Sequence, residues 1–193
     1  MRSVSILFVV SALAASTLPA SALVMVLGTG IAHDCFLQAK FATDPGRGVA
    51  ICNRALEEED LTNSDRAATY VNRGVLEAAL GQNDRAMRDY NYALRLSPNL
   101  GDAYVDLGAA LIFLKNYDEA LAAINKGMAL GLNYPHVGYF NRGVVEEIKE
   151  QFKEAYLDYK HALELEPSFS PASERLKFFT VITKPAAPAQ GGT

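Results

Sequence analysis

The chain has 193 residues, of which 50% are hydrophobic and 21% charged, and its formal net charge is −4. This length allows one domain with a substantial core. Positive and negative residues are interspersed and no run of Lys or Arg stands out, which argues against a general attraction to nucleic acid or to anionic lipid.

An apolar leader opens the chain and extends to Ala32. No charged residue lies between Arg2 and His33, and residues 6–15 are a strongly apolar run behind that single positive charge. A short basic start followed by an apolar stretch is typical of a secretory signal peptide. We therefore predict export to the periplasm, with secretion as an alternative address.

Two cleavage points fit the small-x-small rule for signal peptides, one after Ala22 and one after Ala32. Cleavage after Ala22 would leave an apolar new N-terminus, so we predict removal of residues 1–32 and keep residues 1–22 as the alternative. Residues 4–32 are also long enough to cross a bilayer of about 30 Å. An uncleaved leader would therefore be a membrane anchor, and it is the one feature that predicts contact with a membrane.

The chain contains two cysteines, Cys35 and Cys52, both beyond the leader. An even number of cysteines in an exported chain predicts a disulfide. The alternative is a pair of free, buried thiols, as in a cytosolic protein.

A set of small and aromatic residues recurs between residues 67 and 169. Three Tyr-x-x-x-Gly motifs end at Gly74, Gly108 and Gly143. An alanine, and then a large apolar residue, follow each of these glycines at a constant spacing. These later positions are Ala86, Ala120 and Ala155, then Tyr90, Ile124 and Tyr159. Pro98 and Pro167 close two of the repeats, since proline lacks an amide donor and stops a helix.

This pattern resembles the tetratricopeptide repeat family, whose signature combines an aromatic residue, Leu-Gly, Ala, a second aromatic residue and Pro at a period of about 34 residues. The resemblance implies an all-α fold, a right-handed superhelical solenoid of antiparallel helix pairs. Its three repeats would cover about 67–100, 101–135 and 136–169. The sequence departs from the signature where Tyr replaces Trp and where Arg73 and Arg142 replace Leu.

The ends of the solenoid are predicted from the same register. Residues 33–60 match the repeats weakly and form a degenerate N-terminal hairpin, in which Cys35 and Cys52 occupy facing positions of its two helices. A capping helix is expected over about 170–182, because Ser170-Pro171 is a good helix start. The solenoid domain therefore spans 33–183, and residues 184–193 form a low-complexity tail that we expect to be disordered.

The resemblance also implies a concave groove lined by the first helix of each repeat. In related arrays the position two before the motif glycine faces this groove, where asparagine amides hold the backbone of an extended peptide. Here those residues are Asn72, Asp106 and Asn141. Asp106 can only accept when ionised, which would favour a basic or amide-rich ligand. Alternatively, the three side chains bond to neighbouring helices.

The full set of predicted groove residues adds neighbouring positions on the same helices. The set is Asn72, Arg73, Val75, Asp106, Phe113, Phe140, Asn141 and Arg142. The first helices of the three repeats carry no lysine, so the acidic C-terminal tails that some family members bind are excluded.

No catalytic constellation, metal site or cofactor motif is found, and the three histidines are far apart in the repeat register. We predict a non-enzymatic protein that binds a peptide or protein partner in the cell envelope as an adaptor or scaffold. Two alternatives are a structural protein that associates with copies of itself and a non-catalytic accessory subunit of an envelope enzyme.

Overall fold

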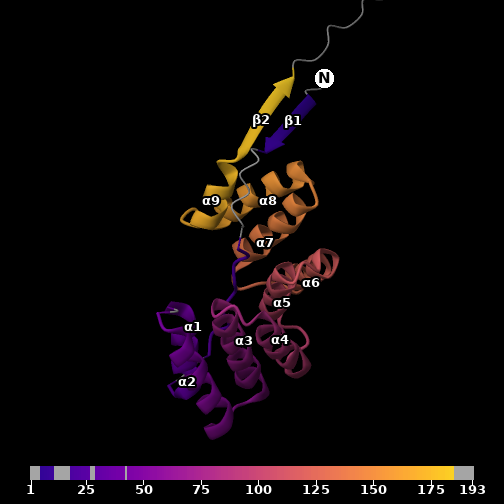
Figure 1. Ribbon diagram of the computed structural model, residues 1–193. Helices are drawn as coiled ribbons and strands as arrows, with labels where there is room; N and C mark the ends of the chain where they lie inside the picture. The colour runs from indigo at the N-terminus through magenta and orange to yellow at the C-terminus, as the bar shows by residue number, and fades with distance from the viewer. Residues whose placement is uncertain (1–4, 11–17, 27–28, 42, 185–193) are drawn as a thin grey trace, which may run out of the picture.

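The computed structural model describes residues 5–10, 18–26, 29–41 and 43–184, and this part of the chain holds nine helices and two strands (Figure 1). The helices form four antiparallel pairs and end in one short helix. The pairs are α1 (Ile31–Phe41) with α2 (Pro45–Glu58), α3 (Asn63–Ala79) with α4 (Asn83–Leu96), α5 (Gly101–Phe113) with α6 (Tyr117–Leu130), and α7 (Pro135–Ile148) with α8 (Phe152–Leu165); α9 is Ser170–Leu176. Successive pairs pack against each other, so the predicted all-α repeat solenoid is confirmed.

Each repeat packs a large side chain of its second helix directly on the glycine of its first helix. A Cβ atom built on Gly74 would lie 2.5 Å from the Tyr90 ring, and one built on Gly108 would lie 2.5 Å from Ile124. Both large side chains are at most 1% exposed. The motif glycine is therefore required because any larger residue would push the two helices of a repeat apart.

The three repeats also turn in the same way. The residue after the C-cap of each first helix has a positive φ, at Gly81 (75°), Lys115 (62°) and Glu150 (59°). In the first repeat, the Gln82 N–H donates to the Glu77 carbonyl at 2.9 Å, which is the bond of a Schellman motif. The tight turn lets the second helix fold back at once along the first.

The N-terminal hairpin is held by a covalent bond and by a capping carboxylate. Cys35 in α1 and Cys52 in α2 are joined by a disulfide, and both are fully buried. Glu59 accepts hydrogen bonds from the backbone N–H groups of Ile31 at 2.7 Å and Ala32 at 2.8 Å. A carboxylate at a helix N-terminus satisfies donors that the helix itself leaves open.

The C-terminal end departs from the predicted range. Helix α9 stops at Leu176, well before the expected end, and strand β2 (Phe179–Lys184) follows it. This strand pairs antiparallel with β1 (Ser5–Val10), with Ser5 opposite Lys184. The β-branched run at 180–183 explains the change, because such side chains favour strands over helices. Residues 185–193, expected to be disordered, lie outside the described part.

Residues 18–26 form no regular element, and in Figure 1 their trace runs from the C-terminal repeat toward α1 and α3. Within the described ranges, no helix combines the length and the apolar composition needed to cross a bilayer.

Candidate peptide-binding groove

Residues 18–26, called the groove segment below, are bound along the first helices of the three repeats. The side chains that hold them are called the polar ladder: Asn72 of α3, Asp106 of α5 and Asn141 of α7. All three are fully buried. Within the described residues, the hydrogen bonds of these three side chains go to this extended backbone.

Each ladder residue contacts the backbone of one residue of the groove segment. The Asn141 amide accepts from the Ala20 N–H at 2.8 Å and donates to the Ala20 carbonyl at 2.7 Å. The Asn72 amide accepts from the Val24 N–H at 3.2 Å and donates to the Val24 carbonyl at 2.8 Å. A carboxamide can donate and accept at once, so it satisfies both polar groups of a peptide residue.

Asp106 occupies the middle position and holds Ala22. Its Oδ1 accepts from the Ala22 N–H at 2.6 Å. Its Oδ2 is buried and has no hydrogen-bond partner among the described residues. Burial raises the pKa of Asp106 well above its usual range.

The groove segment is bound at every second residue. The ladder holds residues 20, 22 and 24, in the reverse order of the repeats, so the segment runs antiparallel to the array. The side chains of Ala22, Val24 and Val26 are 1%, 8% and 3% exposed, whereas Met25 is 58% exposed. This alternation is that of an extended strand with one buried face, although Leu23 on the other face is also partly buried and packs against the core.

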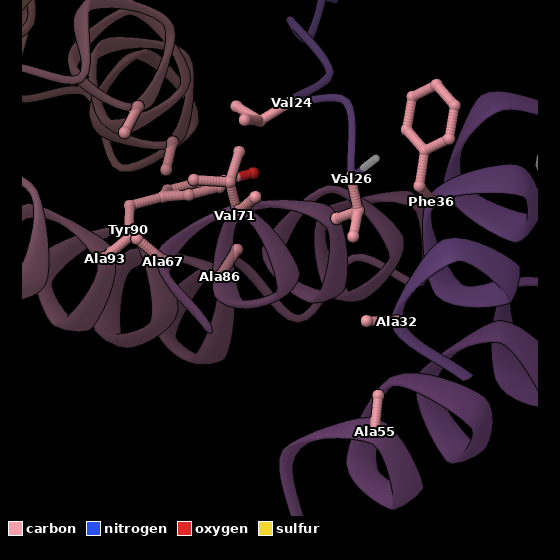
Figure 2. Close-up of a cluster of buried hydrophobic side chains, with 13 residues drawn as sticks. Val24, Val26, Ala32, Phe36, Ala55, Ala67, Val71, Ala86, Tyr90 and Ala93 are labelled. Carbon is pink, nitrogen blue, oxygen red and sulfur yellow. The ribbon is translucent and has the colours of Figure 1, made fainter. Parts of the chain in front are cut away.

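Apolar side chains of the array receive the buried face. Val24 and Val26 join a core cluster with Val71 and Phe36, and Figure 2 shows Val24 over Val71 and Val26 toward Phe36. The smaller Ala22 lies farther along the groove, in a cluster with the two valines of the next helices, Val105 and Val137.

Two predicted groove residues have a different role. Arg73 makes two hydrogen bonds of 2.7 Å to the carboxylate of Asp89 in α4. Arg142 makes the same paired contact, at 2.6 and 2.9 Å, to Asp158 in α8. These arginines tie the first helix of a repeat to its second helix, so their prediction as groove residues is corrected. Sequence reasoning did not find their carboxylate partners.

The three predicted apolar groove residues, Phe140, Phe113 and Val75, differ in how they are buried. Phe140 is 1% exposed and packs between the rings of Tyr159 and Phe169, at centroid distances of 5.6 and 5.3 Å, so it is a core residue. Phe113, the last residue of α5, is 38% exposed. Val75 is half-buried and packs against the cluster that contains Val24 and Val26.

Sequence patterns alone did not reveal the occupant of the groove. They assign residues 18–26 to a leader, although small or β-branched residues alternate at 20, 22, 24 and 26. That period of two was the available signal. It was obscured because the same Ala20-Ser21-Ala22 also fits a cleavage site.

In the part of the chain that the structure describes, no group of three or more His, Cys, Asp or Glu side chains is arranged to hold a metal ion. The arrangement of the groove is instead suited to non-covalent binding of an extended backbone.

Comparison with known proteins agrees with the repeat fold. Two family models described as tetratricopeptide repeat match residues 77–138 and 137–169. A Haemophilus influenzae protein named lipoprotein NlpI homolog is 36% identical over 84 residues, which is 44% of this chain and 26% of that protein. A Mycosarcoma maydis protein, small glutamine-rich tetratricopeptide repeat-containing protein 2, is 32% identical over 91 residues, covering 47% of this chain and 25% of that protein. The chain thus spans about a quarter of the length of these curated relatives.

Solved structures show the same fold. The Arabidopsis OM64 TPR domain is 26% identical, with a TM-score of 0.55 over 60% of this chain and 95% of that one. The first TPR of Spaghetti (RPAP3), bound to the HSP90 peptide SRMEEVD, is 25% identical, with a TM-score of 0.55 over 60% of this chain and 94% of that one. MamA, at 17% identity and a TM-score of 0.57 over 78% and 82% of the two chains, matches in fold alone. From their repeat register, their helix pairs and these matches, residues 77–169 of the chain are tetratricopeptide repeats, which are protein–protein interaction modules.

Proposed function

We propose that this protein is a non-catalytic adaptor that binds an extended segment of a partner protein in its concave groove. The observation that carries the proposal is the polar ladder, which accepts from the backbone N–H groups of residues 20, 22 and 24 and donates to the carbonyls of residues 20 and 24. Backbone contacts of this kind do not depend on the ligand's side chains, so the ladder suits a polypeptide in general.

The strength of such binding follows from the number of contacts. Five hydrogen bonds join the ladder to the groove segment, and each contributes about 1 kcal/mol net. Burial of apolar side chains adds to this, and ordering the peptide opposes it. A groove of three repeats should therefore bind on the order of micromolar, equivalent to about 8 kcal/mol.

We place the protein in the cell envelope, most simply the periplasm. The uncharged stretch between Arg2 and His33 has the layout of an export signal. The buried disulfide of the first hairpin is typical of an oxidising compartment. The name of the Haemophilus relative, a lipoprotein homolog, is in line with this address.

The ladder can be tested in the full chain without a known partner. Replacing Asn72 and Asn141 together with alanine should make the backbone amides of residues 18–26 exchange hydrogen at least about tenfold faster, because four of the five hydrogen bonds are lost. Hydrogen exchange measured by mass spectrometry or NMR gives the readout. Asn91→Ala is the matched control, since Asn91 is exposed and its side chain bonds within α4; it should leave this exchange unchanged.

The opposite result would assign the ladder a structural role: unchanged protection of residues 18–26 together with a large fall in melting temperature. The same variants applied to capture from intact envelopes separate the alternatives. A partner lost from the double variant and kept by Asn91→Ala uses the groove. Capture of further copies of this chain alone, equal in all variants, would instead support the self-associating protein.

A further inference from the structure

The groove that the proposed function assigns to a partner is already filled by the chain itself. All three ladder residues bond to the groove segment, and Val24 and Val26 are part of the core cluster around Val71. A second peptide cannot use the same donors, acceptors and apolar surface at the same time. Binding of the groove segment and binding of a partner are therefore competing events.

The groove segment also shows which side chains the groove admits. Ala22 is 1% exposed among Val105 and Val137, so a larger side chain there would have to displace packed valines. Val24 and Val26 pack in an apolar cluster and are almost fully buried. The side chains that point outward, such as Ser21 and Met25, are exposed and carry no such restriction.

The apolar clusters around the groove segment do not suit a charged ligand. Their described members are aliphatic or aromatic, and the segment itself has no charged residue. Placing a charge among these buried groups would be costly without a partner of opposite sign.

We propose that residues 18–26 are an intramolecular ligand that keeps the groove closed, and that the partner replacing them is an uncharged, extended segment of the same pattern: two small side chains at alternate positions, followed by two β-branched ones. This inference rests on the proposed function and adds the class of ligand and the way in which access is controlled. Displacement or removal of residues 18–26 opens the groove.

The test uses the full chain and a fluorescent synthetic peptide with the sequence of residues 18–26. Ala22→Arg should expel the groove segment, because a long charged side chain cannot enter the site between the valines. Ser21→Arg is the matched control: it introduces the same side chain at the adjacent position, which faces solvent. Fluorescence anisotropy should show that Ala22→Arg binds the peptide at least about tenfold more tightly than the wild type or Ser21→Arg, since an occupied groove is unavailable.

Variants of the peptide test whether the groove requires a small side chain at the position of Ala22. A peptide with Leu in place of Ala22 should bind the Ala22→Arg protein at least about tenfold more weakly, and a peptide with Leu in place of Ser21 should bind unchanged. Circular dichroism verifies that the helices are retained. If Ala22→Arg loses helicity, Ala20→Arg takes its place, because Ala20 is held by Asn141 and is only half-buried.

The outcomes test the intramolecular ligand and the proposed function separately. Equal binding of the peptide to the wild type and to Ala22→Arg would overturn the intramolecular ligand and leave the groove as a peptide site. Equal binding of the two leucine peptides would overturn the small-residue rule. No binding of any peptide to a folded Ala22→Arg protein would overturn the proposed function itself.

Discussion

Two carboxyl groups, the buried Asp106 and the half-buried Glu146, show how position within the array decides the chemistry of a residue. Asp106 stands where the neighbouring repeats have asparagine, and burial raises its pKa well above its usual range. Glu146 lies near the end of α7, where burial in the first place, and the charge of Asp158 in the second, raise its pKa to about 7. Arg142, 3.9 Å away, opposes this shift only in part.

The raised pKa of Glu146 predicts a pH-dependent stability. In the unfolded chain this carboxyl ionises near pH 4.5, and in the folded chain it ionises near pH 7. The folded state therefore loses stability as pH rises from about 4.5 to about 7, and the loss is complete above that range. Glu146→Gln should remove the penalty and raise the free energy of unfolding at pH 8 by an amount on the order of 2 kcal/mol, a value reduced for solvent screening of this half-buried group.

Denaturant unfolding at pH 4.5 and pH 8 measures the Glu146 effect. The gain should be present at pH 8 and small at pH 4.5, where the wild-type carboxyl is largely protonated in the folded state and about half protonated in the unfolded state. Glu57→Gln serves as the control, because Glu57 is exposed in α2. A gain of equal size at both pH values would show that ionisation of Glu146 is not its cause.

At the scale of elements, the N-terminal hairpin depends on its disulfide for stability, because it packs against few other helices. Helices α1 and α2 have a packed neighbour only on the α3 side within the described helices. The disulfide closes a loop with a sequence separation of 17, and a loop of this size contributes about 3 kcal/mol in the chain-entropy model. The hairpin also matters to the groove, because Phe36 of α1 packs in the cluster that receives Val26.

Replacing both Cys35 and Cys52 with serine should therefore loosen α1 and α2 and leave the three repeats helical. We expect a lower thermal midpoint, together with faster hydrogen exchange in α1 and at the Val26 end of the groove segment. Exchange in α5 to α8 should stay at the wild-type level. A double variant that melts like the oxidised wild type would show that the bond does not stabilise the hairpin.

At the scale of the whole molecule, processing of the leader decides whether the groove is open. Export is expected to remove residues 1–32, or alternatively residues 1–22. The first cut would take away the whole groove segment and also Ile31 and Ala32 of α1, whose N–H groups Glu59 holds. The second cut would leave Val24 bound to Asn72 and free the sites of Ala20 and Ala22.

Intact-mass measurement of protein from the cell envelope distinguishes these cuts. We expect a mass that lacks residues 1–32, with loss of residues 1–22 as the alternative. Protein that retains Met1 would contradict processing and support an anchor. The groove segment would then stay on the chain, and access to the groove would depend on its displacement.

Much of the architecture could be predicted from local patterns. The recurrence of glycine, alanine and large apolar residues specified the helix pairs, because each of these contacts is made within one repeat. The facing positions of Cys35 and Cys52 followed from the same register, and so did the shared face of Asn72 and Asn141. Such features are determined by the sequence itself, since helical periodicity fixes which side chains share a face.

Only the tertiary structure decided what fills the groove and which polar groups meet. The contact between Ala20 and Asn141 joins residues 121 positions apart, and the pairing of β1 with β2 joins the two ends of the described chain. The arginines at 73 and 142 share a helix with the ladder, and only the packing of the second helix showed that they face Asp89 and Asp158. The pKa of Asp106 likewise depends on burial under a segment distant in sequence, because desolvation is produced by everything that packs around a group and not by its neighbours along the chain.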